Sequence, residues 1–275
     1  MSAITVAKKD FRDGMRSKAL WLLTALFVLF VPVVAAYDVV SGTSTEDGIP
    51  VTFVLAFVVV MVFLVPVTAL VVSIKSIVRE RSLGTIKLLL VQPHTRGEVF
   101  FGKLLGRTAL MTVAILVAFV PAAVILGLGV SGFPVGWLVA AVVVLVLFGF
   151  TFLVIGLCAS TMTRSETGAT VAGFAIFVLV YAWDSIFAVI NWQLDLVSGN
   201  AELFVHRFNL SVVGDDVITA VESLWNNDVG SASTIVSDGA DAPFYLQHWF
   251  AFVLLGVWIG LPLAIGYWRM NRMEL

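Results

Sequence analysis

The strongest constraint on the fold of this chain is a series of six apolar stretches, each long enough to cross a lipid bilayer. A hydrocarbon core of about 30 Å needs about 20 apolar residues, because a helix rises about 1.5 Å per residue. The six stretches are residues 19–37, 51–74, 108–130, 135–159, 168–190 and 249–268. Asp184, in the fifth stretch, is the one charged residue that they contain. The sequence therefore predicts an all-α integral membrane protein with six transmembrane helices.

The distribution of lysine and arginine predicts the orientation, because loops that remain in the cytoplasm retain these residues. Of the 16 basic residues, all but Arg207 fall before the first stretch, after the second, after the fourth or after the sixth. Both termini are therefore expected in the cytoplasm. Acidic residues gather on the opposite side, chiefly in residues 191–248, which form the longest external segment.

Residues 1–18 are predicted to form an amphipathic helix on the cytoplasmic lipid surface. Apolar positions recur at helical spacing and basic positions cover the remaining surface: Ile4, Ala7, Phe11 and Met15 against Lys8, Lys9, Arg12 and Arg16. The alternative is a basic tail that only fixes the topology. A cleaved signal peptide is disfavoured, because its apolar core spans about 7 to 15 residues and the stretch at 19–37 is longer.

Residues 75–107 form the largest cytoplasmic region between two stretches. The helix of the second stretch is expected to continue to about Arg81 and to break at Gly84. A short apolar helix is then expected over residues 85–92, and it ends at Pro93 because proline interrupts the backbone hydrogen bonds of a helix.

The next helix is expected to begin with a capping box at Thr95. The Thr95 hydroxyl can accept a hydrogen bond from the Glu98 amide, while the Glu98 carboxylate accepts one from the Thr95 amide. This helix is predicted to run without a break into the third apolar stretch.

Residues 97–104, GEVFFGKL, approach the phosphate-loop pattern G-x-x-x-x-G-K-[ST], but Leu104 stands where that pattern needs a hydroxyl. A phosphate loop also joins a strand to a helix, whereas Pro93 and a capping box precede this segment. The chain is therefore not expected to bind ATP. Lys103, which follows Gly102, is instead predicted to reach lipid headgroups where the helix enters the membrane.

Other chemistry finds little support. The sequence contains no H-E-x-x-H or G-x-S-x-G motif, and its three histidines lie outside the apolar stretches, so neither an enzyme active site nor a metal site is predicted. Asp184 is a functional candidate because charged residues inside membrane spans are costly. It lies near the external end of its stretch beside Tyr181 and Trp183, which are typical of an interfacial aromatic belt. We therefore favour an interfacial role for Asp184 over a place in a translocation pathway.

The stretch IVRERSLGTIKLLLVQPHTRGEVFFGKLLG, residues 77–106, resembles the signature of the ABC-2 type permeases, the membrane subunits of ATP-binding-cassette exporters. The matching positions are Arg79, Glu80, Arg81, Gly84, Thr85, Leu88, Pro93, Arg96, Gly102 and Lys103. The amino-terminal AKKDFRDGMRSKALW also resembles the opening of this family. The layout of six spans with a long external link before the last span agrees over the whole chain.

The resemblance implies one permease domain, residues 1–275, with the fold of a type V exporter. It implies a half-transporter in which two permease chains, identical or different, join two copies of a cytoplasmic cassette ATPase that binds ATP and Mg²⁺. This chain would then be non-catalytic and would hold no cofactor of its own. The ATPase-coupling residues would be Arg79, Glu80, Arg81, Gly84, Thr85, Leu88, Pro93 and Arg96, with Arg164 at a second contact in the turn at 162–167. The alternative for 75–107 is a basic loop that only sets the topology.

The resemblance further implies a multi-pass protein of a prokaryotic plasma membrane, in contact with lipid and not with nucleic acid, that exports an unidentified substrate. Size and layout are similar to the permease of the nitrous-oxide reductase maturation system, which is associated with copper-site assembly, although the sequence offers no metal-ligand set. A second alternative is an ATP-independent transporter or channel that uses Asp184.

Overall fold

The computed structural model describes residues 3–42, 49–82, 95–226, 233, 236 and 243–272. In this part of the chain, six helices are long and apolar enough to cross a membrane. They are Lys18–Ser41, Val51–Arg81, Arg96–Gly129, Val135–Met162, Glu166–Leu194 and Phe250–Asn271. These helices coincide with the six predicted stretches, so the predicted all-α membrane fold is confirmed.

The chain divides into two units. Unit 1 comprises Met1–Gly173 and Leu261–Leu275, and unit 2 comprises Phe174–Gly260. Both boundaries fall inside helices, one in α9 (Glu166–Leu194) and one in α12 (Phe250–Asn271). Each unit is therefore described by itself.

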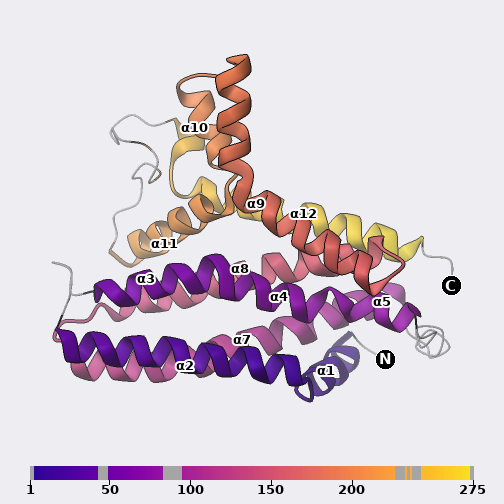
Figure 1. The fold of residues 1–275 in the computed structure, drawn as a ribbon, viewed down its shortest axis with the longest axis horizontal. Coiled ribbons are helices and arrows are strands. Elements are labelled where there is room, and N and C mark those ends of the chain that lie inside the picture. The colour runs from indigo at the N-terminus through magenta and orange to yellow at the C-terminus, as the bar shows by residue number, and fades with distance from the viewer. Residues whose placement is uncertain are drawn as a thin grey trace. The chain divides into compact units, whose positions relative to one another are not determined.

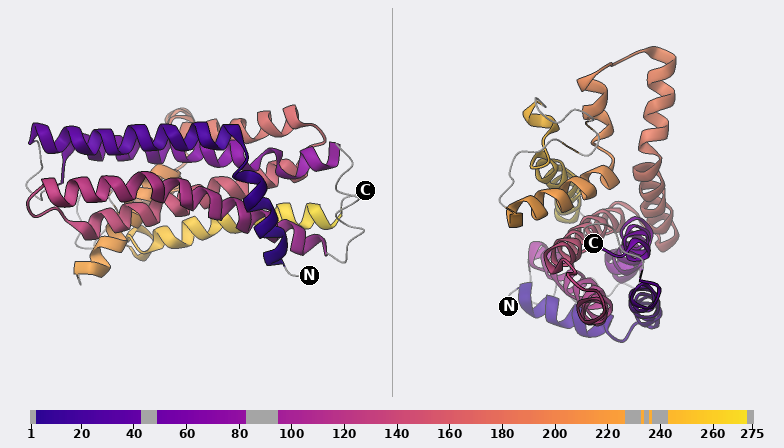
Figure 2. Two further views of the ribbon diagram at one scale, coloured as in Figure 1. Left: turned by 90° about the horizontal axis from the view of Figure 1, so that it is seen from below. Right: turned by 90° about the vertical axis from the view of Figure 1, so that its left-hand side faces the viewer.

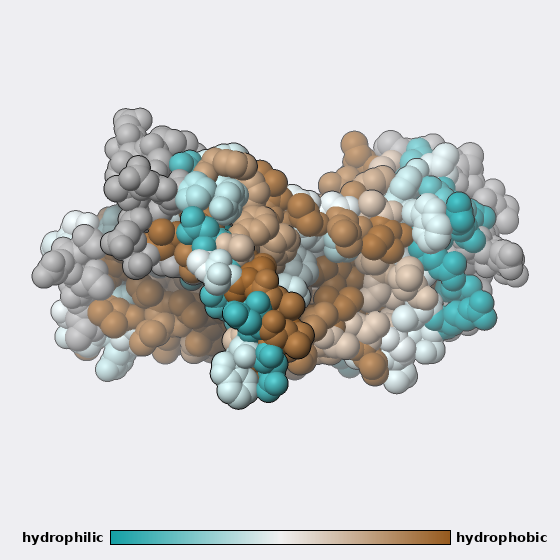
Figure 3. All heavy atoms as spheres, turned by 90° about the horizontal axis from the view of Figure 1, so that it is seen from above, coloured by the Kyte–Doolittle hydropathy of each residue, from teal (hydrophilic) through white to brown (hydrophobic). Residues whose placement is uncertain are grey.

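Unit 1 holds the first four membrane spans. Its own helices are α1 (Ala3–Gly14), α2 (Lys18–Ser41), α3 (Val51–Val59), the π-helix η1 (Val60–Leu64), α4 (Val65–Ser73), α5 (Lys75–Ser82), α7 (Arg96–Gly129) and α8 (Val135–Met162). The helices α2, α3, α4, α7 and α8 run side by side (Figure 1). Hydrophilic residues gather at the right-hand end of Figure 3, where α12 ends.

Small residues let the helices of unit 1 approach closely, as is usual between helices in lipid. A Cβ placed on Gly149 of α8 would lie 3.1 Å from Met111 Cγ of α7, and one placed on Gly156 would collide with Ser73 of α4. Aromatic rings fill the space between α3 and α7, where Phe53 contacts Phe119 edge to face with 6.3 Å between the ring centroids. The core of unit 1 therefore lies along α8, where most inward side chains are fully buried.

The second span changes its helical winding near Pro66. Residues Val60–Leu64 form a π-helix, and α4 begins directly after it with Pro66 in its first turn. A proline inside a helix lacks an amide hydrogen and its ring clashes with the carbonyl four residues earlier. The wider π winding relieves that clash, so the span continues through the proline.

The amphipathic helix α1 lies across unit 1 at the end near the amino terminus (Figure 2, left). It crosses α7 at two glycines one turn apart. A Cβ on Gly102 would lie 2.6 Å from Val6 Cβ, and a Cβ on Gly106 would lie 2.8 Å from the carbonyl oxygen of Ala7. One face of this helix is buried against protein because these glycines admit it, and its other faces remain partly or fully exposed.

Unit 2 contains α10 (Asn200–His206), α11 (Leu210–Asn226) and the 3₁₀ turn η2 (Phe244–Leu246), together with parts of α9 and α12. The helix α11 begins at Leu210, directly after Asn209. The physical reason is that Asn209 caps this helix: its Oδ1 accepts a hydrogen bond from the Ser211 amide at 2.8 Å.

Candidate functional site

The candidate site is the end of unit 1 from which the predicted coupling segment leaves. Residues 83–94, which include Gly84, Thr85, Leu88 and Pro93, lie outside the described residues. The helices that flank this segment are described on both sides, α5 before it and α7 after it. The geometry of the site is therefore the geometry of these two flanking helices and of what holds them.

Lys103 of α7 joins the end of α5 to α1. Its Nζ donates a hydrogen bond to Glu80 Oε1 of α5 at 2.7 Å and lies 3.6 Å from Asp10 Oδ1 of α1. The Lys103 side chain is only 4% exposed. A charged amine buried to this degree requires partners of opposite charge, and these two carboxylates provide them.

Arg107 lies one turn farther along α7 and holds Asp10 from its other side. Its Nε lies 2.6 Å from Asp10 Oδ2, and its Nη2 donates to Asp10 Oδ1 at 3.0 Å. Its Nη1 donates to the backbone carbonyl of Val72 in α4 at 3.0 Å. We call Asp10, Glu80, Lys103 and Arg107 the charge network. Two carboxylates and two cations balance one another in it, and they join three helices.

The interpretation that Lys103 reaches lipid headgroups is wrong. Gly102 and Gly106 have no side chains to keep α1 away, so α1 covers this part of α7 and encloses Lys103. The amine then pairs with protein carboxylates and not with lipid.

The beginning of α7 is fixed by the capping box and by α12. The Glu98 amide donates to Thr95 Oγ1 at 3.2 Å, and the Thr95 amide donates to Glu98 Oε2 at 2.8 Å. Arg96 Nη1 donates to the carbonyl of Asn271 at 2.7 Å, at the end of α12. The cation thereby satisfies a carbonyl that the helix end leaves without an intrahelical partner. The helix then continues unbroken to Gly129, as predicted.

The beginning of α5 is held by Ser160 of α8. Only Ile74, itself in α-helical conformation, separates α4 from α5, and the span continues as a helix to Arg81 as predicted. In the first turn of α5, Ser160 Oγ accepts hydrogen bonds from the amides of Ile77 and Val78 at 3.1 and 2.9 Å.

The short turn between α8 and α9 lies beside α5. Lys75, the first residue of α5, lies 3.3 Å from Glu166 Oε2, the first residue of α9. This pair is largely exposed and contributes little to stability. It nonetheless places the turn that carries Arg164 next to the helix that leads into residues 83–94. Arg164 and Arg79 are exposed, and Arg81 is partly buried.

Asp184 lies in unit 2 and takes part in holding the external segment. Its carboxylate lies 3.1 Å from His206 Nδ1 of α10 and accepts a hydrogen bond from Asn209 Nδ2. The adjacent Trp183 Nε1 donates to the carbonyl of Val205 at 3.0 Å. These contacts give Asp184 a structural partner for each oxygen, which fits the favoured interfacial role.

Sequence reasoning missed four functional candidates. Asp10 and Arg107 belong to the charge network, and Ser160 caps α5. Unit 2 adds the buried Arg207, whose Nη2 donates to Asp216 Oδ2 at 2.7 Å. The sequence holds a signal for Arg107. It lies four residues after Lys103, so both cations lie on one face of a helix and predict an acidic partner there.

The described residues hold no group of three or more His, Cys, Asp or Glu side chains that could bind a metal ion. The arrangement is mechanical in character. Ion pairs join three helices, of which α5 and α7 flank residues 83–94, and this arrangement suits the transmission of movement better than bond chemistry.

Comparison with known proteins agrees with the resemblance seen in the sequence. Residues 4–275 match the family described as ABC-2 family transporter protein. Two curated relatives carry the name probable ABC transporter permease protein NosY. The one from Stutzerimonas stutzeri is 28% identical over 97% of this chain and 97% of its own length. The one from Pseudomonas aeruginosa is 27% identical over 98% of this chain and 97% of its own length.

Proposed function

We propose that this chain, which belongs to the ABC-2 family of transporter proteins, exports a substrate. The energy comes from ATP that a separate cassette ATPase hydrolyses. The chain is the non-catalytic, multi-pass membrane permease of such a transporter. The proposal includes the direction of transport, which is export, and the composition of the complex. The proposed complex contains two ATPase copies and a second permease chain, and ATP and Mg²⁺ are bound by the ATPase copies.

The charge network is the observation that carries the proposed coupling. Residues 83–94 leave α5 two residues after Arg81 and return at the capping box of α7. A force applied to this segment is delivered to both helices at once. Because Lys103 ties α5 to α7 and Asp10 adds α1, the three helices respond as one body.

The proposed coupling surface consists of the predicted residues around this base. Gly84, Thr85, Leu88 and Pro93 belong to the segment. Arg79 and Arg81 precede it in α5, Arg96 follows it in α7, and Arg164 lies in the turn before α9. In this proposal Glu80 has a positioning role, since its carboxylate is directed to Lys103. The ATPase contacts the segment 83–94 as the main coupling element and the turn at 162–167 as a smaller one.

Co-purification with a cassette ATPase from the same organism tests the proposal. The permease is extracted in mild detergent with that ATPase, and the complex is reconstituted into vesicles. The expected result is that the ATPase co-elutes with the permease and that ATP hydrolysis is slower without it. Failure to capture the ATPase, together with transport that persists without ATP, would overturn the proposal in favour of an ATP-independent transporter.

A second candidate is a role in copper-site maturation of nitrous-oxide reductase. Its support is that both relatives named above are called NosY permeases and match nearly the full chain. The test is deletion of the chain in its host, followed by metal analysis of the reductase. A reductase that keeps its full copper content after deletion would exclude this role and leave general export.

A further inference from the structure

The surface of α1 is divided into three sectors: one is buried against α7, one is apolar and partly exposed, and one is basic and exposed. Val6, Asp10 and Gly14 are buried against α7. Ile4, which is 70% exposed, shares a second sector with Phe11 and Met15. At 3.6 residues per turn the third sector lies about a quarter turn beyond the second. It is basic, and its members are Lys8, Lys9, Arg12 and Arg16.

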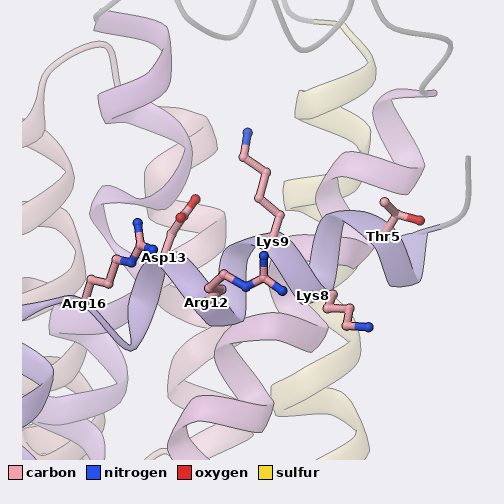
Figure 4. Close-up of a pocket in the computed structure, with 6 residues that line it drawn as sticks. All are labelled: Thr5, Lys8, Lys9, Arg12, Asp13 and Arg16. Atoms are coloured by element: carbon pink, nitrogen blue, oxygen red, sulfur yellow. The ribbon is translucent and has the colours of Figure 1, made fainter.

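The basic sector is open and its cations are not neutralised by the protein. Thr5, Lys8, Lys9, Arg12, Asp13 and Arg16 line a groove of about 430 Å³, and Figure 4 shows them following one another along α1. All four cations are exposed, and none forms an ion pair with a carboxylate among the residues that the structure describes. Asp13 offsets only one of the four charges. The groove therefore has a net positive charge and suits an anion.

The apolar sector identifies the surroundings of this groove. Trp21, the aromatic residue near the beginning of α2, is 57% exposed, and its Nε1 donates to the carbonyl of Met15 at 2.8 Å. Exposed tryptophan is enriched where the polar headgroups meet the hydrocarbon. This bond places the apolar sector of α1 beside an interfacial tryptophan. A helix with apolar side chains on one side and unpaired cations next to them lies in the plane of the membrane surface.

We propose that the groove on α1 binds the headgroups of anionic phospholipids of the cytoplasmic leaflet. The acyl chains lie against Ile4, Phe11 and Met15, while the phosphate oxygens accept hydrogen bonds from Lys8, Arg12 and Arg16. The charge complementarity and the adjacent apolar sector together favour a lipid over a soluble anion, which would make no use of Ile4. The site is independent of the proposed transport role. Lys8, Arg12 and Arg16 lie on the side of the helix away from Asp10, whereas Lys9 and Asp13 also line a small groove with members of the charge network.

Native mass spectrometry of the full-length protein in detergent tests the proposal, with phosphatidylglycerol and phosphatidylcholine offered as competing ligands. Each cation near an anionic surface contributes about 1 kcal/mol, which is about fivefold in affinity. The double variant Lys8→Gln/Arg12→Gln is expected to lose the preference for phosphatidylglycerol by about tenfold or more. The control Arg269→Gln/Arg272→Gln removes the same charge from the other terminus and is expected to keep the preference.

A second variant separates a lipid from a protein partner. Ile4→Gln keeps every cation but removes the most exposed apolar side chain of α1, and it is expected to weaken phosphatidylglycerol binding severalfold. The proposal is overturned if Lys8→Gln/Arg12→Gln binds phosphatidylglycerol like the parent protein. If Lys8→Gln/Arg12→Gln loses binding to the ATPase while its lipid binding is unchanged, the basic sector is a protein contact and the proposal is also overturned.

Discussion

Lys103 of α7 donates a hydrogen bond of 2.7 Å to Glu80 of α5, although the two residues lie on helices separated by the predicted coupling segment. The pair is buried on the lysine side, which is 4% exposed, and partly open on the glutamate side, which is 28% exposed. The hydrogen bond joins α5 and α7, the two helices that flank residues 83–94 in the sequence.

Lys103→Met is expected to destabilise unit 1 by about 3 kcal/mol, because removal of one partner leaves Glu80 facing a buried apolar side chain. The effect is measured as a lower midpoint of thermal unfolding, followed by tryptophan fluorescence in detergent. Lys75→Gln is the control, since its pair with Glu166 is exposed and its loss should change little. Equal decreases of the unfolding midpoint in the two variants would show that the buried Lys103–Glu80 pair stabilises the protein no more than the exposed Lys75–Glu166 pair does.

Glu80→Gln is expected to reduce stimulation of the partner ATPase while the permease still inserts into the membrane. The neutral amide weakens the link between α5 and α7, so movement of one helix is transmitted less fully to the other. The measurement is the ATP hydrolysis rate of the reconstituted complex, normalised to the amount of permease. Asp195→Asn, which removes an exposed carboxylate of unit 2, serves as the control. Parent-like stimulation in Glu80→Gln would argue against the proposed coupling path.

Gly106→Ala is expected to destabilise the protein by about 1–3 kcal/mol, because its Cβ would lie 2.8 Å from a backbone oxygen of α1. Gly127→Ala in the same helix is the matched control, since a Cβ there meets nothing within 4 Å. Alanine is the better helix former, so the control should be neutral or stabilising. Thermal unfolding compares the two, and a parent-like Gly106→Ala would mean that α1 does not pack this closely.

Ser160→Ala is expected to cost about 1–3 kcal/mol, because two buried amides of α5 lose their acceptor. Thr151→Val in the same helix removes a buried hydroxyl that donates to the carbonyl of Leu147 in its own helix, and its effect should be smaller. Hydrogen exchange at Ile77 and Val78 gives the sharper measurement. Faster exchange at these amides is expected in Ser160→Ala, and unchanged protection there would contradict the capping role.

Asp216→Asn is expected to unfold part of the external segment, because Arg207 would remain fully buried without its carboxylate. Removal of one partner from such a pair costs about 3–5 kcal/mol. Asp215→Asn alters the neighbouring residue, which is exposed, and provides the control. Limited proteolysis from the external side should cut only the Asp216 variant faster. Identical cleavage of both variants would remove the basis for a structural role of Arg207.

Much of the architecture could be read from local sequence. The six spans follow from apolar runs, and the capping box follows from Thr95 and Glu98 being three residues apart, so each depends on neighbours along the chain. The amphipathic character of residues 3–14 was equally visible. These features need no knowledge of which helices touch.

Other features could not be predicted because they depend on which helices are neighbours. The sequence marked Lys103 as a cation at a membrane entry, and only the crossing of α1 over Gly102 and Gly106 made it a buried ion pair. In the sequence Asp216 is one of many acidic residues of 191–248, and only the approach of Arg207 makes it a buried ion-pair partner. Hydropathy along the chain determined the membrane fold of this protein, since burial in lipid depends on length and composition. The tertiary structure decided the partner of each charge, since a salt bridge forms only between side chains that packing brings within reach.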